Sequence, residues 1–337
     1  KIIAEAWDAA GLCEAISFIG HRWAEWNGQF RDDVRRFVKG DSHTVGPLAQ
    51  RLMASPDLYP TPTRNPNRSI NFITAHDGFT LYDLVSYNEK HNEANGEDNR
   101  DGHNDNLSWN HGSEGETNDP QISALRLRQI KNFFTILLIA QGTPMLSMGD
   151  EIMRTQKGNN NAYSQDNEIS WFNWKDVDKN KQFLSFVQKA IAFTQGHELF
   201  GDRHFWRPDG EGSGPCVTWH GIHLNQPDWG ADSRSLAFTL DHAKSNEHLC
   251  VLLNSYWEPL TFQLMPLPVE ERWHRVIDTA QPYPDDFRNP ETSPAIDADR
   301  YTVEARSVVV LIAKDVVKRP RPTDLFRRIN RHMRLIL

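Results

Sequence analysis

Carboxylate side chains end three of the short apolar runs in this sequence. Glu5 follows an Ile-Ile-Ala run, Asp77 follows a longer run and a histidine, His76, and Asp150 and Glu151 follow a run that contains two methionines. Hydrolysis of a glycosidic bond needs one protonated carboxyl group that donates to the leaving oxygen and a second carboxylate as nucleophile or base. Acids at strand ends also cap helices or lie in solvated loops, and a histidine there is often structural. Both interpretations are open from the pattern alone.

Short apolar runs bounded by polar residues are typical of buried parallel strands. We expect four such strands, at Lys1–Ala4, Trp23–Asn27, Ser69–Ala75 and Pro144–Met148.

Helical signals follow these runs. Helices are predicted at Phe30–Gly40, Thr80–Tyr87 and Phe183–Thr194, and another begins after Asp119. That helix has the clearest start, because Asp119 can accept hydrogen bonds as its N-cap and a proline follows at the first helical position. Its apolar residues recur three and four positions apart, as on one face of a helix, at Ile130, Phe133, Phe134, Leu137 and Leu138.

Strands that alternate with helices and end in acids predict an α/β fold. In a (β/α)8 barrel the catalytic groups lie at the carboxyl ends of the strands, and a closed barrel needs eight strand–helix units. Four units are recognisable here, so we expect half of such a barrel over residues 1–195.

The pattern changes after a Gly- and Pro-punctuated segment at residues 196–215, which we interpret as a linker. Strand-like runs separated by turn residues follow over residues 216–314 and predict an antiparallel β-sandwich. These runs are Ser235–Leu240, His248–Asn254, Leu260–Leu264, Trp273–Asp278 and Tyr301–Ile312. Residues 315–337 form an Arg-rich basic tail, interpreted as a solvated helix in preference to an interaction tail.

Composition and termini exclude several classes of protein. The net charge of −8 argues against a nucleic-acid partner, which normally requires a basic face. No apolar run reaches the ~18 residues of a membrane span. Cys13, Cys216 and Cys250 lack paired or metal-binding spacing, so we expect reduced thiols. The chain opens Lys-Ile-Ile without Met or a signal peptide, so we expect an internal portion of a longer protein.

Metal and cofactor motifs are not evident. Residues 97–108 loosely resemble an EF-hand loop, but Glu97 and Ser108 occupy positions that require Asp and Glu. No HExxH, Gly-rich phosphate loop or GxSxG occurs, so we expect no metal site and no cofactor. The polar segment Asn88–Asp119 is far longer than an ordinary connection, and such loops are usually functional or disordered.

Three strand-end segments resemble the α-amylase superfamily. Ile2–Asp8 is similar to the end of the fifth barrel strand, Ile70–Phe79 to the end of the seventh, and Gly142–Glu151 to the eighth. The resemblance therefore implies strands five to eight of a (β/α)8 barrel, followed by the β-sandwich.

Further stretches are similar to isoamylase and bacterial glycogen debranching enzymes within that superfamily. They are Trp23–Asn27 with Phe30–Asp33, Tyr87–Asn99, and Gly158–Trp171. The resemblance is strong to about residue 195 and looser over the sandwich, and the Arg-rich tail is not matched.

The resemblance implies roles for the strand-end acids. Glu5 would be the general acid/base, and Asp77 would bind the distorted sugar and favour the transition state, with His76 beside it. The family's nucleophilic Asp ends the fourth strand two residues after an Arg. No Arg-x-Asp strand end occurs in this chain, so we expect the nucleophile upstream of Lys1, in a missing half-barrel supplied by the same or another chain.

Several residues are candidates for substrate contact, each with a structural alternative. Trp7 would give Glu5 an apolar neighbour or be core, and Trp26 and Tyr163 would face sugar rings or be structural. The polar side chains of Asn161, Gln165 and Asp166 would bind hydroxyls or satisfy their own loop.

The resemblance implies hydrolysis of α-1,6 branch linkages of glycogen or starch-like glucans with retention of configuration. The alternatives are an α-1,4-acting hydrolase or transferase, and a non-catalytic glucan-binding fragment. We expect the chain alone to be inactive, a branched α-glucan as substrate, no nucleic-acid or membrane partner, and a cytoplasmic location.

Overall fold

The computed structural model describes residues 2–5, 23–59, 65–208, 210 and 214–316. Trp7, Cys13 and the Arg-rich tail lie outside these residues, and so do the predictions made for them. No helix in the described part of the chain is long and apolar enough to cross a membrane. Cys250 is a buried free thiol, as predicted.

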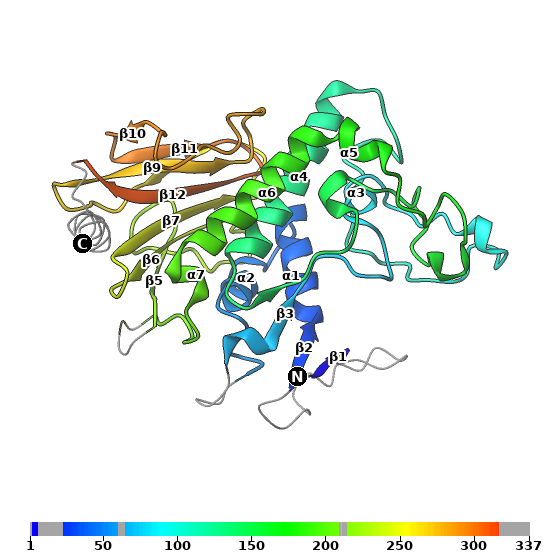
Figure 1. Ribbon diagram of the computed structural model, residues 1–337, viewed down its shortest axis with the longest axis horizontal. Helices are drawn as coiled ribbons and strands as arrows, with labels where there is room; N and C mark the ends of the chain where they lie inside the picture. The colour runs from blue at the N-terminus through cyan, green and yellow to red at the C-terminus, as the bar shows by residue number, and fades with distance from the viewer. Residues whose placement is uncertain (1, 6–22, 60–64, 209, 211–213, 317–337) are drawn as a thin grey trace, which may run out of the picture.

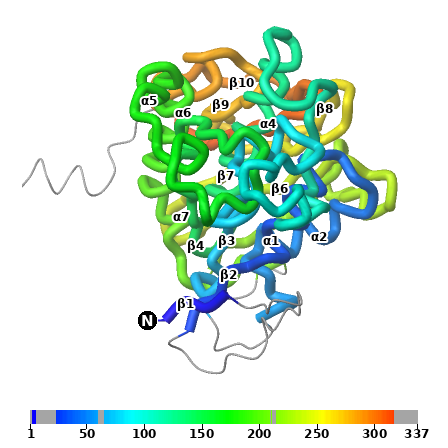
Figure 2. Tube along the Cα trace, turned by 90° about the vertical axis from the view of Figure 1, so that its right-hand side faces the viewer, coloured from blue at the N-terminus to red at the C-terminus, as the bar shows by residue number. Residues whose placement is uncertain are grey.

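The first sheet has four strands in chain order: β1 (Ile2–Glu5), β2 (Trp23–Asn27), β3 (Ser69–Asn71) and β4 (Thr143–Pro144). Every neighbouring pair is parallel, and Glu5 pairs with Trp26, which pairs with Ile70. The carboxyl ends of the strands therefore lie along one edge of the sheet, and β1 lies at its outer side (Figures 1 and 2).

Two details of this sheet differ from the sequence prediction. β3 and β4 end earlier than predicted, so residues 72–78 and 145–149 are irregular segments beyond the strand ends. Ile2 and Ile3 were expected to be buried but are 49% and 53% exposed, because β1 is the edge strand of the described sheet.

Helices follow the strands of this sheet. They are α1 (Gly28–Lys39), α2 (Val45–Leu52), α3 (Leu81–Leu84), α4 (Pro120–Ile139), α5 (Lys175–Lys179), α6 (Lys181–Gly196) and α7 (Glu198–Gly201). α1 packs on β3, and α2 and α4 pack on α1. Short 3-10 turns are η1 (Pro66–Arg68), η2 (Glu93–Asn95), η3 (Asp150–Ile152) and η4 (Ala162–Ser164).

Capping residues decide where these helices begin. Asp119 accepts from the N–H groups of Gln121 and Ile122, which confirms the predicted start of α4. α1 begins two residues before its predicted start, because the Asn27 side chain accepts from the N–H of Phe30. α2 was not predicted, although Thr44 stands at its N-cap position; the Thr44 hydroxyl makes no capping bond and donates to the carbonyl of Asp41.

The second half of the chain forms antiparallel sheets, as predicted. A six-stranded sheet has the order β10-β9-β12-β7-β6-β5, and β11 pairs with β8 in a second sheet. The strands are β5 (Cys216–His220), β6 (Ser235–His242), β7 (Glu247–Asn254), β8 (Leu260–Gln263), β9 (Glu271–Asp278), β10 (Ala295–Ile296), β11 (Arg300–Val303) and β12 (Ser307–Asp315). The single strand predicted at Tyr301–Ile312 is therefore two strands in different sheets, and β5 was missed.

One hydrophobic core joins the helices to the six-stranded sheet. Leu249, Val251 and Leu253 of β7 belong to the same buried cluster as Phe134 of α4 and Phe186 of α6. The intervening residues of β7 pack in a second cluster with β8 and β11. Both faces of β7 are buried, which explains its continuous apolar sequence.

Polar contacts cross the same boundary. The Lys131 ammonium of α4 lies 2.6 Å from the Asp286 carboxylate, and both side chains are almost fully buried. Asn132 donates to the carbonyl of Arg306 and accepts from the hydroxyl of Thr279. The helices and the antiparallel sheet are thus joined by buried polar groups as well as by apolar packing.

The buried carboxyl group of Asp150 connects the segments that follow β3 and β4. Its Oδ1 accepts from the N–H of Leu81 at 2.9 Å, and its Oδ2 accepts from the hydroxyl of Thr74. Burial raises the pKa of Asp150 to about 6, although these two hydrogen bonds act in the opposite direction. This strand-end acid therefore has a structural role.

Asp150→Asn should alter how stability depends on pH. The ordinary pKa is 3.8 and the folded-state value about 6, so the folded protein binds more protons in that window. The contribution of Asp150 to the free energy of unfolding therefore falls as pH rises through it. Asparagine keeps both hydrogen bonds, with Oδ1 toward Leu81 and Nδ2 toward the Thr74 hydroxyl, and does not titrate.

Urea denaturation from about pH 4 to about pH 7 checks this, because the stability of the variant relative to the parent chain should rise with pH. Asp297→Asn is the control, since that carboxylate is 87% exposed. A relative stability that is flat or falls with pH would contradict the assignment.

Candidate active site

Side chains from three neighbouring strand ends meet beside the parallel sheet. Glu5 ends β1, Trp26 lies in β2, and His76 follows β3. The Glu5 Oε1 lies 4.0 Å from the His76 Nε2, and the rings of Trp26 and His76 are 5.6 Å apart between centroids. Three residues predicted from the sequence are thus brought together, because the carboxyl ends of parallel strands share one edge.

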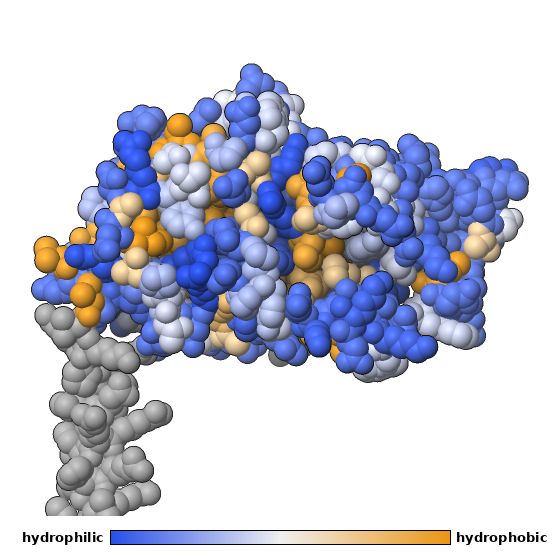
Figure 3. Space-filling view, turned by 90° about the horizontal axis from the view of Figure 1, so that it is seen from above, coloured by the Kyte–Doolittle hydropathy of each residue, from blue (hydrophilic) through white to orange (hydrophobic). Residues whose placement is uncertain are grey.

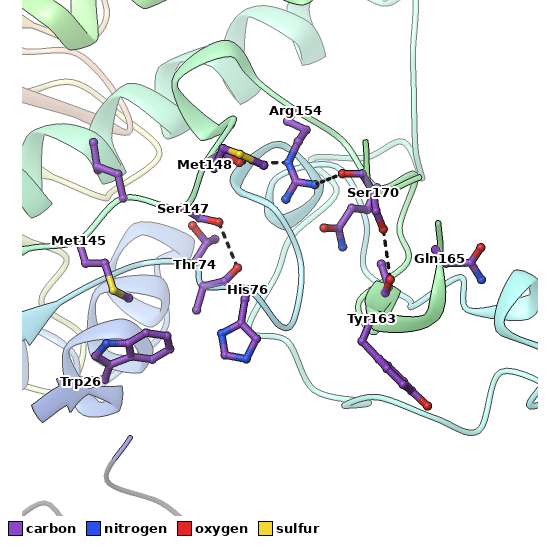
Figure 4. A pocket seen from close by; sticks show the side chains of 14 residues that line it. Trp26, Thr74, His76, Met145, Ser147, Met148, Arg154, Tyr163, Gln165 and Ser170 are labelled. Carbon is purple, nitrogen blue, oxygen red and sulfur yellow. Dashed lines mark hydrogen bonds between the residues drawn. The ribbon is translucent and has the colours of Figure 1, made fainter. Parts of the chain in front are cut away.

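A cavity of about 490 Å³ opens at this edge. Trp26 and His76 lie side by side on one side of it, and Tyr163 and Gln165 lie across from them (Figure 4). Residues of the segment after β4 complete the lining, namely Met145, Leu146, Ser147 and Met148.

Arg154 was not predicted but contributes to this lining. Its guanidinium donates to the carbonyl oxygens of Met148 at 3.1 Å and Ser170 at 3.3 Å. It thereby joins the segment after β4 to the polar loop that carries Tyr163 (Figure 4).

The described part of the cavity is open to solvent. The side chains of Glu5 and His76 are 46% and 67% exposed, and Tyr163 is 88% exposed. The apolar neighbour expected for Glu5, Trp7, lies outside the described residues.

Asp77 lines a second, smaller hollow next to the first. This hollow measures about 220 Å³ and is lined by charged side chains, among them Arg31, Asp32 and Asp105. Ala75 lines both hollows. His76 and Asp77 are adjacent in sequence, so one short irregular segment presents polar groups to both.

The backbone of that segment is held at several points. Arg35 donates from Nε and Nη2 to the carbonyl of Ile73, at 3.0 and 2.6 Å. The Ser147 hydroxyl donates to the carbonyl of Ala75, and the N–H of Gly78 donates to the carbonyl of Asn160. Burial lowers the pKa of the Arg35 guanidinium to about 9. Sequence analysis missed Arg35, since a charged residue within an amphipathic helix usually faces solvent.

Side chains of the polar loop at residues 156–170 form hydrogen bonds with the 88–119 loop and with nearby residues. Asn161 donates to Asp101, Gln165 donates to the side chain of Asn95, and Asp166 accepts from the indole of Trp171. Among the predicted loop residues only Tyr163 and Gln165 line the larger cavity. The structure thus favours the structural alternative for the side chains of Asn161 and Asp166.

A second buried carboxylate forms hydrogen bonds with the start of this loop. Asp83 of α3 accepts from the hydroxyl of Thr155 and from the N–H of Gln156. Burial raises the pKa of Asp83 to about 6, against the opposing effect of these hydrogen bonds.

The two long loops lie at the end of the molecule away from the antiparallel sheets, and this end is largely hydrophilic (Figures 1 and 3). No group of His, Cys, Asp and Glu in the described residues has the arrangement of a metal site.

The sequence of this chain is similar to those of several known proteins. A family profile described as "Isoamylase 1-3, C-terminal" matches residues 218–311. The chain is 42% identical over 331 residues to the glycogen operon protein GlgX homolog of Mycobacterium tuberculosis, covering 92% of this chain and 45% of that protein. It is 42% identical over 318 residues to the chloroplastic isoamylase 3 of Oryza sativa, covering 93% and 39%. The glycogen debranching enzyme of Erwinia tasmaniensis is 41% identical over 276 residues, covering 82% and 40%.

Two solved structures of pullulanases are similar to this chain in fold. Pullulanase from Bacillus acidopullulyticus superposes with a TM-score of 0.66 at 18% identity, covering 92% of this chain and 34% of that one. Pullulanase type I from Bacillus subtilis, complexed with maltose, gives a TM-score of 0.64 at 18% identity, covering 92% and 39%.

The chain spans less than half the length of these relatives. The sequence identity extends over both the parallel and the antiparallel part. Over most of its length the chain is therefore similar in sequence to isoamylases and to a glycogen debranching enzyme.

Proposed function

We propose that this chain is the C-terminal part of a retaining glycoside hydrolase that cleaves α-1,6 branch linkages of glycogen or starch-like glucans. The observation that carries the proposal is the approach of Glu5 to His76, which lines one cavity together with Trp26. A carboxyl group, an imidazole and an aromatic face suit a sugar ring, whose hydroxyls need polar partners and whose C–H face packs on aromatic rings.

The four parallel strands act as strands five to eight of a (β/α)8 barrel in this proposal. Their parallel order in chain sequence supports it, as does the likeness of fold to pullulanases. We assign residues 1–195 to the half-barrel, 196–215 to a linker, 216–314 to a β-sandwich domain and 315–337 to a basic tail. The segment 196–215 contains α7 and the buried Trp206, so the proposed linker packs on the body.

Glu5 protonates the glycosidic oxygen and then activates the water that attacks the intermediate. Asp77 and His76 bind the hydroxyls of the distorted sugar and favour the oxocarbenium-like transition state. The nucleophilic carboxylate comes from a segment outside this chain, which adds its strands to the exposed side of β1.

Trp26, Tyr163 and Gln165 contact the glucan, and Trp7, Asn161 and Asp166 remain candidates for contact. The cytoplasmic location stays a prediction, since several plant relatives are named chloroplastic.

The first test concerns the chain itself. Residues 1–337 alone should release no linear chains from branched glucan, whereas the complete enzyme, meaning this chain joined to the nucleophile-bearing segment, should do so. The outer edge of β1, which pairs with no other strand among the described residues, should also make the isolated chain self-associate, which light scattering measures. Debranching by the monomeric chain would refute the claim that the nucleophile lies outside residues 1–337. Cleavage of linear α-1,4 glucan by the complete enzyme would favour the α-1,4-acting alternative, and binding without cleavage would favour a binding fragment.

Glu5→Gln in the complete enzyme should lower kcat by roughly 10²–10⁴-fold, because an amide cannot donate the proton that the leaving oxygen needs. Reducing-end release from branched glucan is the measurement. Glu151→Gln is the matched control, since that acid lies in η3 and accepts from the N–H of Gly149, whereas Glu5 approaches His76. Near-normal turnover of the Glu5 variant would exclude the general acid role.

Asp77→Asn should lower kcat together with kcat/KM, because a group that acts in the transition state contributes to both parameters. Steady-state kinetics of the complete enzyme on branched glucan would measure this. A variant in which only KM rises would show that Asp77 is a simple binding contact.

A further inference from the structure

The side chain of Asn160 joins separate parts of the two long loops. It is 2% exposed. Its Nδ2 donates to the carbonyl of His103 at 2.8 Å and to the Oδ1 of Asn106 at 2.9 Å. Its Oδ1 accepts from the Nδ2 of Asn92 at 2.9 Å. Both amide hydrogens and the amide oxygen are therefore used in the protein interior.

The backbone of Asn160 extends the same network to the candidate site. Its N–H donates to the Oδ1 of Asn92 at 3.0 Å, and its carbonyl accepts from the N–H of Gly78 at 3.0 Å. Gly78 directly follows Asp77 and has a φ of 76°, in the left-handed region that favours glycine. The bond to Asn160 thus fixes the turn that carries the Asp77 carboxylate.

The hydrogen-bond network also reaches Ile73, at the start of the irregular segment that ends at Gly78. Asn106, which accepts from Asn160, also accepts through its carbonyl from Arg35 at 3.0 Å. Arg35 in turn binds the carbonyl of Ile73. The irregular segment from Ile73 to Gly78 is therefore held at both ends by groups that meet at Asn106.

The packing leaves little room for adjustment around Asn160. A Cβ atom placed on Gly102 would lie 2.3 Å from the Asn160 Oδ1. The loop that contains residues 102–106 therefore approaches the amide as closely as a glycine permits.

We propose that Asn160 is a positioning residue for Asp77, one that holds the Asp77–Gly78 turn against the 88–119 loop by its buried amide. The proposal rests on the role given to Asp77 in the proposed function. A group that acts on a transition state must be held to within about 0.5 Å of its productive position, and Asp77 itself is exposed. Its position must therefore come from the backbone on either side.

Asn160→Ala in the complete enzyme should lower kcat roughly tenfold to a hundredfold, the cost of a misplacement of about 1 Å, with KM changed by less than about threefold. Asn132→Ala is the matched control. Asn132 is 3% exposed and its amide also makes several side-chain hydrogen bonds, but between α4 and the antiparallel sheet. Both variants should lose similar thermal stability, and only Asn160→Ala should lose turnover. Unchanged kcat in Asn160→Ala, or an equal loss in both variants, would overturn the proposal.

Hydrogen exchange separates this inference from the proposed function. The N–H of Gly78 should exchange faster in Asn160→Ala than in the parent protein, and at the parent rate in Asn132→Ala. This readout needs no activity. An inactive parent enzyme would therefore defeat the proposed function, whereas unchanged exchange at Gly78 would defeat the role of Asn160.

A second pair of variants serves if Asn160→Ala does not fold. Asn106→Asp keeps the oxygen that accepts from Asn160 and loses the hydrogen bond that the Asn106 amide donates to the carbonyl of His103, whereas Asn106→Leu removes both. Gly78 exchange and kcat should therefore change less in the first variant than in the second. Equal behaviour of both variants would contradict the network.

Discussion

The guanidinium of Arg35 donates three hydrogen bonds to backbone carbonyl groups within the protein interior. Two of them end on Ile73, where the chain has left β3 and no neighbouring strand is available to pair with the carbonyl. The third ends on Asn106, in the long loop. Irregular backbone next to a core is stable only when its polar groups find partners, and the fixed fork of an arginine offers several at once.

The rest of the site follows from that constraint. Because Ile73 is fixed, Thr74 can reach Asp150, and the adjacent residues reach Ser147 and Asn160. The burial that raises the pKa of Asp150 is the same burial that makes its hydrogen bonds strong. The edge that carries the candidate site therefore combines exposed polar groups with a buried polar support, as expected where a rigid scaffold positions residues on loops.

The sequence predicted those features whose signals are local. The Asp119-Pro120 start of α4, the run of β7, and the approach of Glu5 to His76 each follow from a short pattern or from the geometry of parallel strands. Arg35 and Asn160 could not be predicted in this way, because the partners of their side chains lie 38 to 71 positions away along the chain. The extent of β3 and β4 was overestimated for a related reason. Their apolar residues continue past the last strand pairing because they line a core and a cavity.

The shared core beneath the six-stranded sheet has a consequence for exchanging parts between related enzymes. Alternate residues of β7 pack on α4 and α6, and the buried pair of Lys131 and Asp286 crosses the same boundary. The antiparallel sheets therefore cannot be exchanged as an independent unit, because they share a core with the helices. A chimaera that joined this parallel sheet to the C-terminal part of a homologue would have to carry the matching face of α4 with it. The natural crossover point lies ahead of that helix, within the loop that precedes Asp119, and not in the segment between the two sheets.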